Sequence, residues 1–235
     1  MAALVILPGL DGTTTMHDAF KHAAASVFES VVAIRFPAER VLGYAALEEW
    51  IRPRLPCEQP FWLLGESFSG PLALSIAASP PPNLAGVILS TTFARVAVPW
   101  LKPLAPLVRM APAQYAPLSL LRWLLLGRWA TKPLTQALAD AISEVAPNVL
   151  QARAALTLQV DVTSLLTSIS LPVLYLRATE DRLLAPSAWK PITSAVKHAR
   201  KVDIEGPHLL LQARPVECAK AIAGFIRSSG TPCHT

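Results

Sequence analysis

A serine flanked by glycines is the residue of this chain whose setting most clearly allows chemistry. Ser67 lies in the segment 65–70, which reads Gly-Glu-Ser-Phe-Ser-Gly. An apolar run precedes it at 61–64, and a helix pattern of small residues follows it at 71–78. A strand, a sharp turn and a helix around Gly-x-Ser-x-Gly form a nucleophile elbow, in which the serine hydroxyl points out of the top of a sheet. The glycines are needed because a Cβ there would collide with the neighbouring chain. We therefore predict that Ser67 is a nucleophile.

A serine hydroxyl is a poor nucleophile at neutral pH, so it needs a base, and the base needs an orienting acid. In proteins with this elbow the chain order is serine, acid, histidine. The base that fits is His208, which follows Gly206-Pro207 in a short loop and precedes an apolar helix pattern. The remaining histidines lie in exposed helical patterns, in the tail or after the first loop, and His17 after that loop is the strongest rival: His22, His198, His234 and His17.

The acid candidate follows the fifth predicted strand. Asp181 lies just past residues 173–177 and before Leu-Leu-Ala-Pro, a sequence typical of the entry to a helix. Glu180 is its immediate rival, and Glu66 and Asp203 are more distant ones. We predict that Ser67, His208 and Asp181 form a catalytic triad.

The loop at 7–13, Leu-Pro-Gly-Leu-Asp-Gly-Thr, leaves the first predicted strand. Acyl transfer develops negative charge on a carbonyl oxygen, and backbone amides aimed at that oxygen stabilise it. One amide of an elbow protein comes from the residue after the nucleophile, here Phe68. We predict that the other comes from Leu10. The loop also fits a plain turn, since Gly and Asp are turn residues, and Asp11 is a further candidate for substrate binding.

Strands and helices that alternate along the chain must position these groups. Most of the strand-like runs are short and continuously apolar, which is typical of strands buried on both faces of a parallel sheet. Their alternation with helices predicts an open doubly wound α/β sheet, which binds ligands at the carboxyl ends of its strands. The strand runs are 3–7, 31–36, 61–64, 85–90, 173–177 and 201–204, and the helix patterns are 16–26, 44–54, 68–78, 188–198 and 216–227.

The alternation breaks between Phe93 and about Ser164, where seven prolines occur and helices at 118–126 and 134–145 fit better than strands. We interpret 93–164 as a helical cap inserted into a core of residues 1–92 and 165–235. The alternative is a set of additional core-covering helices. The cap predicts an apolar acyl pocket lined by its tryptophans and a leucine run: Trp100, Trp123, Trp129 and 124–126.

Composition narrows the class of protein. A 52% apolar and 16% charged chain of 235 residues can bury the core of one large α/β domain. No apolar run reaches the roughly 18 residues of a membrane span, and residues 1–10 resemble a strand more than a signal peptide. The cysteines, Cys57, Cys218 and Cys233, lack metal spacing and are expected to be free thiols in a reducing cytoplasm. Neither a metal site nor a nucleic-acid motif is predicted.

The net charge of +5 belongs to the predicted cap, because its part 93–160 holds seven basic residues against Asp140 and Glu144. Such a segment could steer an anionic partner, for example an acyl carrier protein or an anionic lipid surface. It could equally be a solvated basic face. The basic residues are Arg95, Lys102, Arg109, Arg122, Arg128, Lys132 and Arg153.

The motifs Gly9-Leu10, 65–70, Asp181 and His208 together resemble the α/β-hydrolase superfamily over nearly the whole chain. Within it, the chain is similar to small capped carboxylesterases such as pimeloyl-acyl-carrier-protein methyl ester esterases, and the opening loop is similar to that of plastid phytyl ester synthases. Two features depart from the family: Pro8-Gly9 stands where His-Gly is usual, and the N-terminal hairpin is missing. The resemblance therefore implies a six-stranded, all-parallel sheet trimmed at one edge.

These observations predict a serine carboxylesterase that needs no metal or organic cofactor and acts on a small-molecule ester, including esters carried by an acyl carrier protein. An acyltransferase would use the same triad and an alcohol in place of water. A cofactor-free haloperoxidase or a C–C bond hydrolase would use similar residues. A ligand-binding receptor on the same fold is the alternative outside catalysis.

Overall fold

A computed structural model describes residues 2–96 and 117–229 of the chain. Trp100, which we predicted as a pocket residue, lies outside the described residues, as do Cys233 and His234. Within the described residues six strands form one sheet, in the order β2-β1-β3-β4-β5-β6, and every neighbouring pair is parallel. The predicted six-stranded, all-parallel sheet is therefore confirmed.

Each predicted strand corresponds to one observed strand, with ends that differ by at most three residues. The strands are β1 Ala3–Leu7, β2 Ser30–Ala33, β3 Phe61–Glu66, β4 Leu84–Ser90, β5 Val173–Ala178 and β6 Ala199–Ile204. The α-helices within the described ranges are α1 Asp18–Ala24, α2 Tyr44–Ile51, α3 Gly70–Ala78, α5 Leu118–Leu125, α6 Lys132–Ser143, α7 Pro147–Thr157, α8 Lys190–Ala195, α9 Leu210–Ala213 and α10 Pro215–Ser228.

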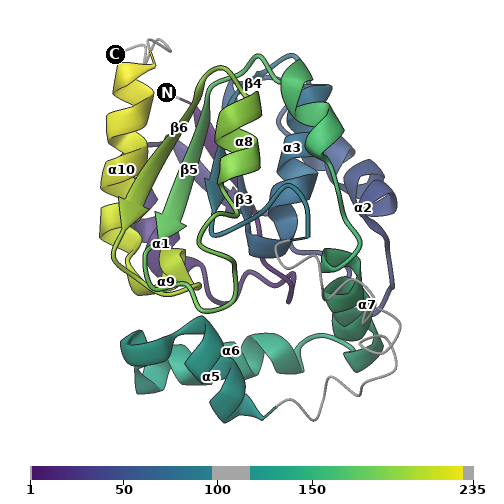
Figure 1. Ribbon diagram of the computed structural model, residues 1–235, viewed down its shortest axis with the longest axis vertical. Coiled ribbons are helices and arrows are strands. Elements are labelled where there is room, and N and C mark those ends of the chain that lie inside the picture. The colour runs from purple at the N-terminus through teal and green to yellow at the C-terminus, as the bar shows by residue number, and fades with distance from the viewer. Residues whose placement is uncertain (1, 97–116, 230–235) are drawn as a thin grey trace.

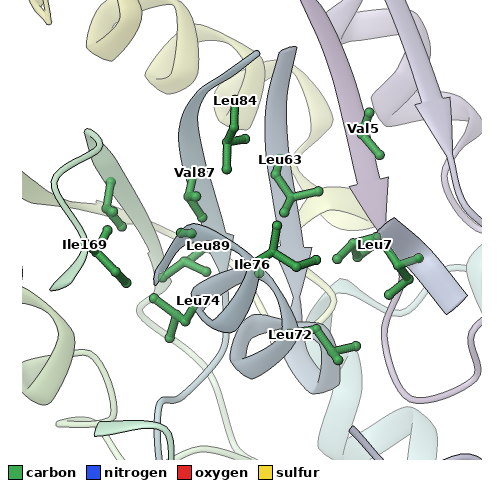
Figure 2. Packing of buried hydrophobic residues seen from close by; sticks show 14 of the residues in the cluster. Val5, Leu7, Leu63, Leu72, Leu74, Ile76, Leu84, Val87, Leu89 and Ile169 are labelled. Carbon is green, nitrogen blue, oxygen red and sulfur yellow. The ribbon is translucent and has the colours of Figure 1, made fainter. Parts of the chain in front are cut away.

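The sheet lies between two layers of helices, because successive side chains of a strand point to opposite faces. In β1, Val5 and Leu7 pack with α2, α3 and α8, whereas Leu4 and Ile6 pack with α1 and α10. Figure 1 shows α1 and α10 on one side of the strands and α2, α3 and α8 on the other. Figure 2 shows the first of these clusters, where leucines of β3 and β4 meet α3. Burial on both faces explains why the strands are continuously apolar.

The segment that follows β4 leaves the sheet and returns to it at one place. Val96 N donates to Val160 O at 3.1 Å, and Val162 N donates to Ala94 O at 2.8 Å, so the outgoing and returning chains run side by side. Between these points lie α5, α6 and α7. Figure 1 shows α5 and α6 across the end of the molecule toward which the arrows of β5 and β6 point. These helices therefore face the carboxyl ends of the parallel strands.

Candidate active site

The turn after β3 holds Ser67 in a backbone conformation that few residues adopt. Its φ is +47°, in the left-handed region that costs a non-glycine residue free energy. A Cβ at Gly65 would lie 2.8 Å from Ala73 Cβ, and one at Gly70 would overlap the Thr92 side chain. The two glycines thus let α3 approach β3 and β4 closely enough to impose the turn. This is the backbone of the predicted elbow.

The structure brings the three predicted residues of the triad together from three separate loops. Ser67 Oγ lies 2.8 Å from His208 Nε2, and His208 Nδ1 lies 2.9 Å from Asp181 Oδ2. A carboxylate can only accept hydrogen bonds, so Nδ1 carries a proton and Nε2 is left to accept from the serine hydroxyl. The imidazole is buried, with 2% of its side chain exposed, which holds the ring between its two partners.

Asp181 is held as a carboxylate. Burial by itself would raise its pKa, but the charge of His208 and three hydrogen bonds, from His208, Leu184 and Leu183, outweigh burial and lower the pKa below the ordinary value. Its Oδ1 accepts from the backbone N–H groups of Leu183 at 2.8 Å and Leu184 at 3.0 Å. Both carboxylate oxygens are therefore used, one by the imidazole and the other by the start of the following turn.

The rival acids have other partners. Glu180 turns away from the imidazole and pairs with Arg128 at 2.5 Å, while Trp129 Nε1 donates to it at 3.3 Å. Asp203 is an exposed side chain that pairs with Lys201 and Arg177. Glu66 is fully buried and accepts from Gln212 Nε2 at 2.9 Å.

The rival base also has another partner. His17 Nε2 lies 2.8 Å from Glu66 Oε2, and both side chains are only 2% exposed. The ring is therefore engaged by this carboxylate. Of the described histidines, His208 is the one whose ring contacts Ser67.

The loop after β1 lies against the elbow, as the predicted oxyanion role requires. A Cβ at Gly9 would be 4.0 Å from Ser67 Cβ, and the Ser69 hydroxyl donates to Pro8 O. Leu10 and Phe68 line the same cavity as Ser67. The Phe68 ring is fully buried and stacks on Tyr44 with ring centroids 4.8 Å apart, which fixes the turn that carries its N–H. Sequence reasoning missed Tyr44, because an aromatic residue at a helix start gives no sign of its contacts.

A cavity of about 500 Å³ opens beside Ser67 and His208, within the range of about 300–1,000 Å³ typical of small-molecule sites. Its described wall is mainly apolar and comes both from loops at the sheet and from the helices α5, α6 and α7. Leu121, Leu124 and Leu125 of α5, Leu138 and Ile142 of α6, and Leu150 and Leu158 near α7 contribute to it. Such a wall suits an apolar group of the substrate.

The two described tryptophans that we predicted as pocket residues are absent from this wall, so that part of the pocket prediction is wrong. Trp123 is 55% exposed, and its ring faces the Arg182 guanidinium at 5.0 Å. Trp129 lies between Arg128 and Arg214, whose guanidinium carbons are 5.1 and 4.9 Å from its ring. Arginine stacking holds both indoles outside the cavity. The neighbouring leucines Leu124 and Leu125, predicted with them, do line it.

Other kinds of site find no support in the described part of the chain. Across residues 2–96 and 117–229 no group of three or more His, Cys, Asp or Glu side chains could hold a metal ion. Cys57 and Cys218 are free thiols. In the same ranges no helix is both long and apolar enough to cross a membrane.

Known proteins share this architecture. A family model described as serine aminopeptidase, S33 matches residues 44–210. No curated protein is significantly similar in sequence. A hydrolase from Pseudomonas aeruginosa PA01 has a TM-score of 0.80 at 18% identity, with 96% of this chain and 89% of that chain covered. An enol-lactonase from Burkholderia xenovorans LB400 has a TM-score of 0.77 at 16% identity, covering 96% and 91%. A thermophilic esterase from Thermogutta terrifontis has a TM-score of 0.74 at 21% identity, covering 98% and 91%.

Because their sequence identities are low, these structural likenesses establish the fold alone. They confirm the predicted α/β-hydrolase fold. The family match covers more than half of the sequence and includes the elbow, the Asp181 loop and His208. The chain is therefore a hydrolase of the α/β-hydrolase fold and belongs to the serine aminopeptidase S33 family.

Proposed function

We propose that this protein is a serine carboxylesterase that hydrolyses esters with an apolar acyl group through an acyl-serine intermediate. The observation that carries the proposal is the continuous contact from Ser67 through His208 to Asp181 at the edge of a largely apolar cavity. A nucleophile, a base and an orienting carboxylate in hydrogen-bond reach form the minimal machinery for acyl transfer.

The reaction proceeds in two halves. His208 Nε2 takes the Ser67 proton as Oγ attacks the ester carbonyl, and the N–H groups of Leu10 and Phe68 stabilise the resulting oxyanion. The C–O bond to the alcohol then breaks, and the alcohol leaves with the proton from His208. Water next gives a proton to His208 while its oxygen attacks the acyl carbon. The bond between that carbon and Ser67 Oγ then breaks, Oγ takes the proton back from His208, and the acid is released. Asp181 stabilises the imidazolium in both halves.

The segment 93–164 is proposed to act as a cap over this site, with residues 1–92 and 165–235 as the core. Two observations support the boundary. The backbone hydrogen bonds at Val96–Val160 and Val162–Ala94 join the ends of the segment where it leaves the core. The helices within it supply much of the described cavity wall. The cap would thus determine which acyl groups fit.

The family description raises a second candidate, hydrolysis of N-terminal peptide bonds. The mainly aliphatic wall favours an acyl ester over a charged peptide N-terminus, because an ammonium group loses hydration in such surroundings. An acyltransferase would use the same triad with an alcohol in place of water. We expect turnover of p-nitrophenyl butyrate but not of alanine p-nitroanilide, and free acid as the main product even with added alcohol. The reverse preferences would favour those alternatives.

Replacing the proposed nucleophile tests the function directly. Ser67→Ala should reduce p-nitrophenyl ester hydrolysis to background, because alanine has no hydroxyl to form the acyl-enzyme. Ser75→Ala in α3 is the matched control and should keep full activity. Circular dichroism and thermal unfolding show whether each variant is folded. A folded Ser67→Ala protein that retains turnover, or a wild-type serine that a fluorophosphonate fails to label, would refute the proposal.

A further inference from the structure

An arginine of the inserted segment lies buried against the loop of the proposed oxyanion donor. Arg153, in α7, is 2% exposed. Its Nη1 donates to Leu10 O at 3.1 Å and to Asp11 O at 2.7 Å, and its Nη2 donates to Pro37 O at 2.9 Å. A buried cation is costly unless its N–H groups are satisfied. Three backbone carbonyls from two loops meet that need here, and the same bonds hold the loops in place.

The loop after β1 is shaped around this guanidinium. Gly12 has a φ of +70°, and a Cβ at this position would lie 2.4 Å from Arg153 Nη1 and 2.9 Å from Phe36 Cβ. Only glycine therefore lets the backbone turn over the arginine. Burial lowers the pKa of Arg153 to about 10, although the charge of Asp11 acts to raise it. The side chain therefore remains a cation at neutral pH.

The same helix forms a wall of the cavity. Leu150, Ala154, Thr157 and Leu158 line it, three of them within α7 and Leu158 directly after it. With 3.6 residues per turn, Arg153 lies at the edge of the helix face defined by Leu150 and Thr157. The helix face that would touch an acyl chain thus adjoins the side chain that holds the oxyanion loop.

We propose that Arg153 is a positioning residue that couples the filling of the acyl cavity to the geometry of the oxyanion loop. The inference rests on the proposed esterase function. An acyl chain that packs against α7 holds this helix in place, and with it the guanidinium of Arg153. Because the guanidinium bonds the carbonyls of Leu10 and Asp11, it then aligns the backbone that carries the Leu10 N–H. Binding energy from the distal acyl chain is then used in the transition state and raises kcat as well as affinity.

The test compares wild type with Arg153→Lys, Arg153→Ala and Arg122→Lys on p-nitrophenyl acetate, butyrate and octanoate. Lysine keeps the charge, but its single nitrogen cannot replace two guanidinium nitrogens that bond carbonyls of two separate loops. We expect kcat of both Arg153 variants to fall by about 10- to 100-fold, approaching the loss of one oxyanion donor, with KM for butyrate changed by less than about threefold. Added guanidinium should restore part of kcat in Arg153→Ala. The exposed-site control Arg122→Lys should behave as wild type.

A second expected result separates positioning from plain stability. In wild type, kcat should rise with acyl length, and in the Arg153 variants this rise should flatten. Rates are expressed per active site labelled with a fluorophosphonate, so that unfolded protein does not count. If Arg153→Lys folds too poorly to assay, Gly12→Ala displaces the guanidinium from the other side and should show the same selective loss of kcat.

Unchanged kcat per labelled site in Arg153→Lys and Gly12→Ala, with only a lower melting temperature, would overturn the inference and leave the esterase proposal intact. A wild-type protein inactive on all three esters and unlabelled by the fluorophosphonate would overturn both. A loss of affinity alone, with KM raised and kcat kept, would also overturn it, because the arginine would then act in substrate binding only.

Discussion

Ser67 keeps its unusual backbone conformation through contacts that lie outside the proposed triad. The Thr92 hydroxyl donates to the Ser67 carbonyl, and Thr92 also fills the space that Gly70 leaves open. Tyr175 of β5 fixes Thr92 in turn, because its hydroxyl donates to Thr92 O at 2.5 Å and accepts from Thr92 N at 3.2 Å. The elbow is thus supported by the two strands after it in the sheet order, and its strain is offset by a packed network.

The choice between two adjacent acids gives a prediction for single residues. Asp181→Asn should lower kcat by about 10⁴-fold, because an amide can neither hold the correct imidazole tautomer nor stabilise the imidazolium. Glu180→Gln should change kcat by only a few fold, since its partners are Arg128 and Trp129. Steady-state kinetics of both variants measure this, and a larger loss at Glu180 than at Asp181 would contradict it.

At the level of residues, the sequence predicted which candidate catalytic side chains meet better than it predicted what surrounds them. The order serine, acid, histidine and the position of each after a strand were enough to select Ser67, Asp181 and His208, which the structure brings into contact. Trp123 and Trp129 were misplaced, because composition does not reveal that an arginine holds an indole outward. Arg153 was counted only as part of a basic segment, although a lone arginine among small and apolar residues of a helix is a sign of burial.

Three separate elements are joined behind the elbow by a buried polar cluster. Glu66 at the end of β3 binds His17, just before α1, and Gln212 of α9. Burial would raise the pKa of Glu66, but the charge and hydrogen bond of His17 and the Gln212 bond lower it overall. Burial would likewise lower the pKa of His17, and the charge of Lys21 acts in the same direction. The charge and hydrogen bond of Glu66, together with the charge of Asp11, outweigh both and raise the pKa overall. The pair therefore holds the loop after β1 against β3 through a buried hydrogen bond, and each partner favours the charged form of the other.

This pair predicts how stability depends on pH. A histidine whose folded pKa is raised adds stability that is complete below its unfolded value of about 6.5 and is lost as pH rises through the folded pKa. The excess in unfolding free energy of wild type over His17→Gln should therefore be complete at about pH 6 and shrink as the pH is raised from there into the alkaline range. Urea unfolding at several pH values measures it. His22→Gln, at an exposed site in α1, is the control. An excess that stays constant over this range would contradict the prediction.

The elements themselves were largely predictable, because strands buried on both faces are continuously apolar and stand out between helix patterns. β1 matches its prediction at both ends, whereas β2 ends three residues early, at Ala33. Helix ends were less well predicted: α8 covers only Lys190–Ala195 of the expected 188–198. Within the inserted segment α7 was not singled out, because its apolar residues face both the core and the cavity and leave no clear one-sided pattern.

On the scale of the molecule, two basic residues of the segment 93–164 form contacts near the candidate site that the sequence did not predict. Arg153 is buried against the loop after β1, for which we propose an oxyanion role, and Arg128 bridges Glu180 and Glu205, which flank the Asp181 and His208 loops. Leu209 N also donates to Leu125 O at 3.0 Å, so α5 is tied by its backbone to the residue after His208. Part of the basic excess thus fastens the segment to the site. Recruitment of an acyl carrier protein by its remaining basic surface stays a prediction.

Because α5 and α6 lie over the carboxyl ends of the strands (Figure 1), we predict that acyl preference depends on those of their side chains that line the cavity. Neighbouring side chains that face solvent should not affect it. Leu124 lines the cavity, whereas Trp123 beside it is mostly exposed and stacks on Arg182. Leu124→Trp should fill part of the cavity and lower kcat/KM for p-nitrophenyl octanoate by at least about tenfold, because a site for an apolar chain discriminates by the space it offers. The value for the acetate ester, which needs little of the cavity, should change by less than about threefold. Trp123→Ala is the matched control and should leave the octanoate-to-acetate ratio of kcat/KM unchanged. A shift of that ratio in Trp123→Ala, or none in Leu124→Trp, would mean that the acyl chain binds outside this cavity.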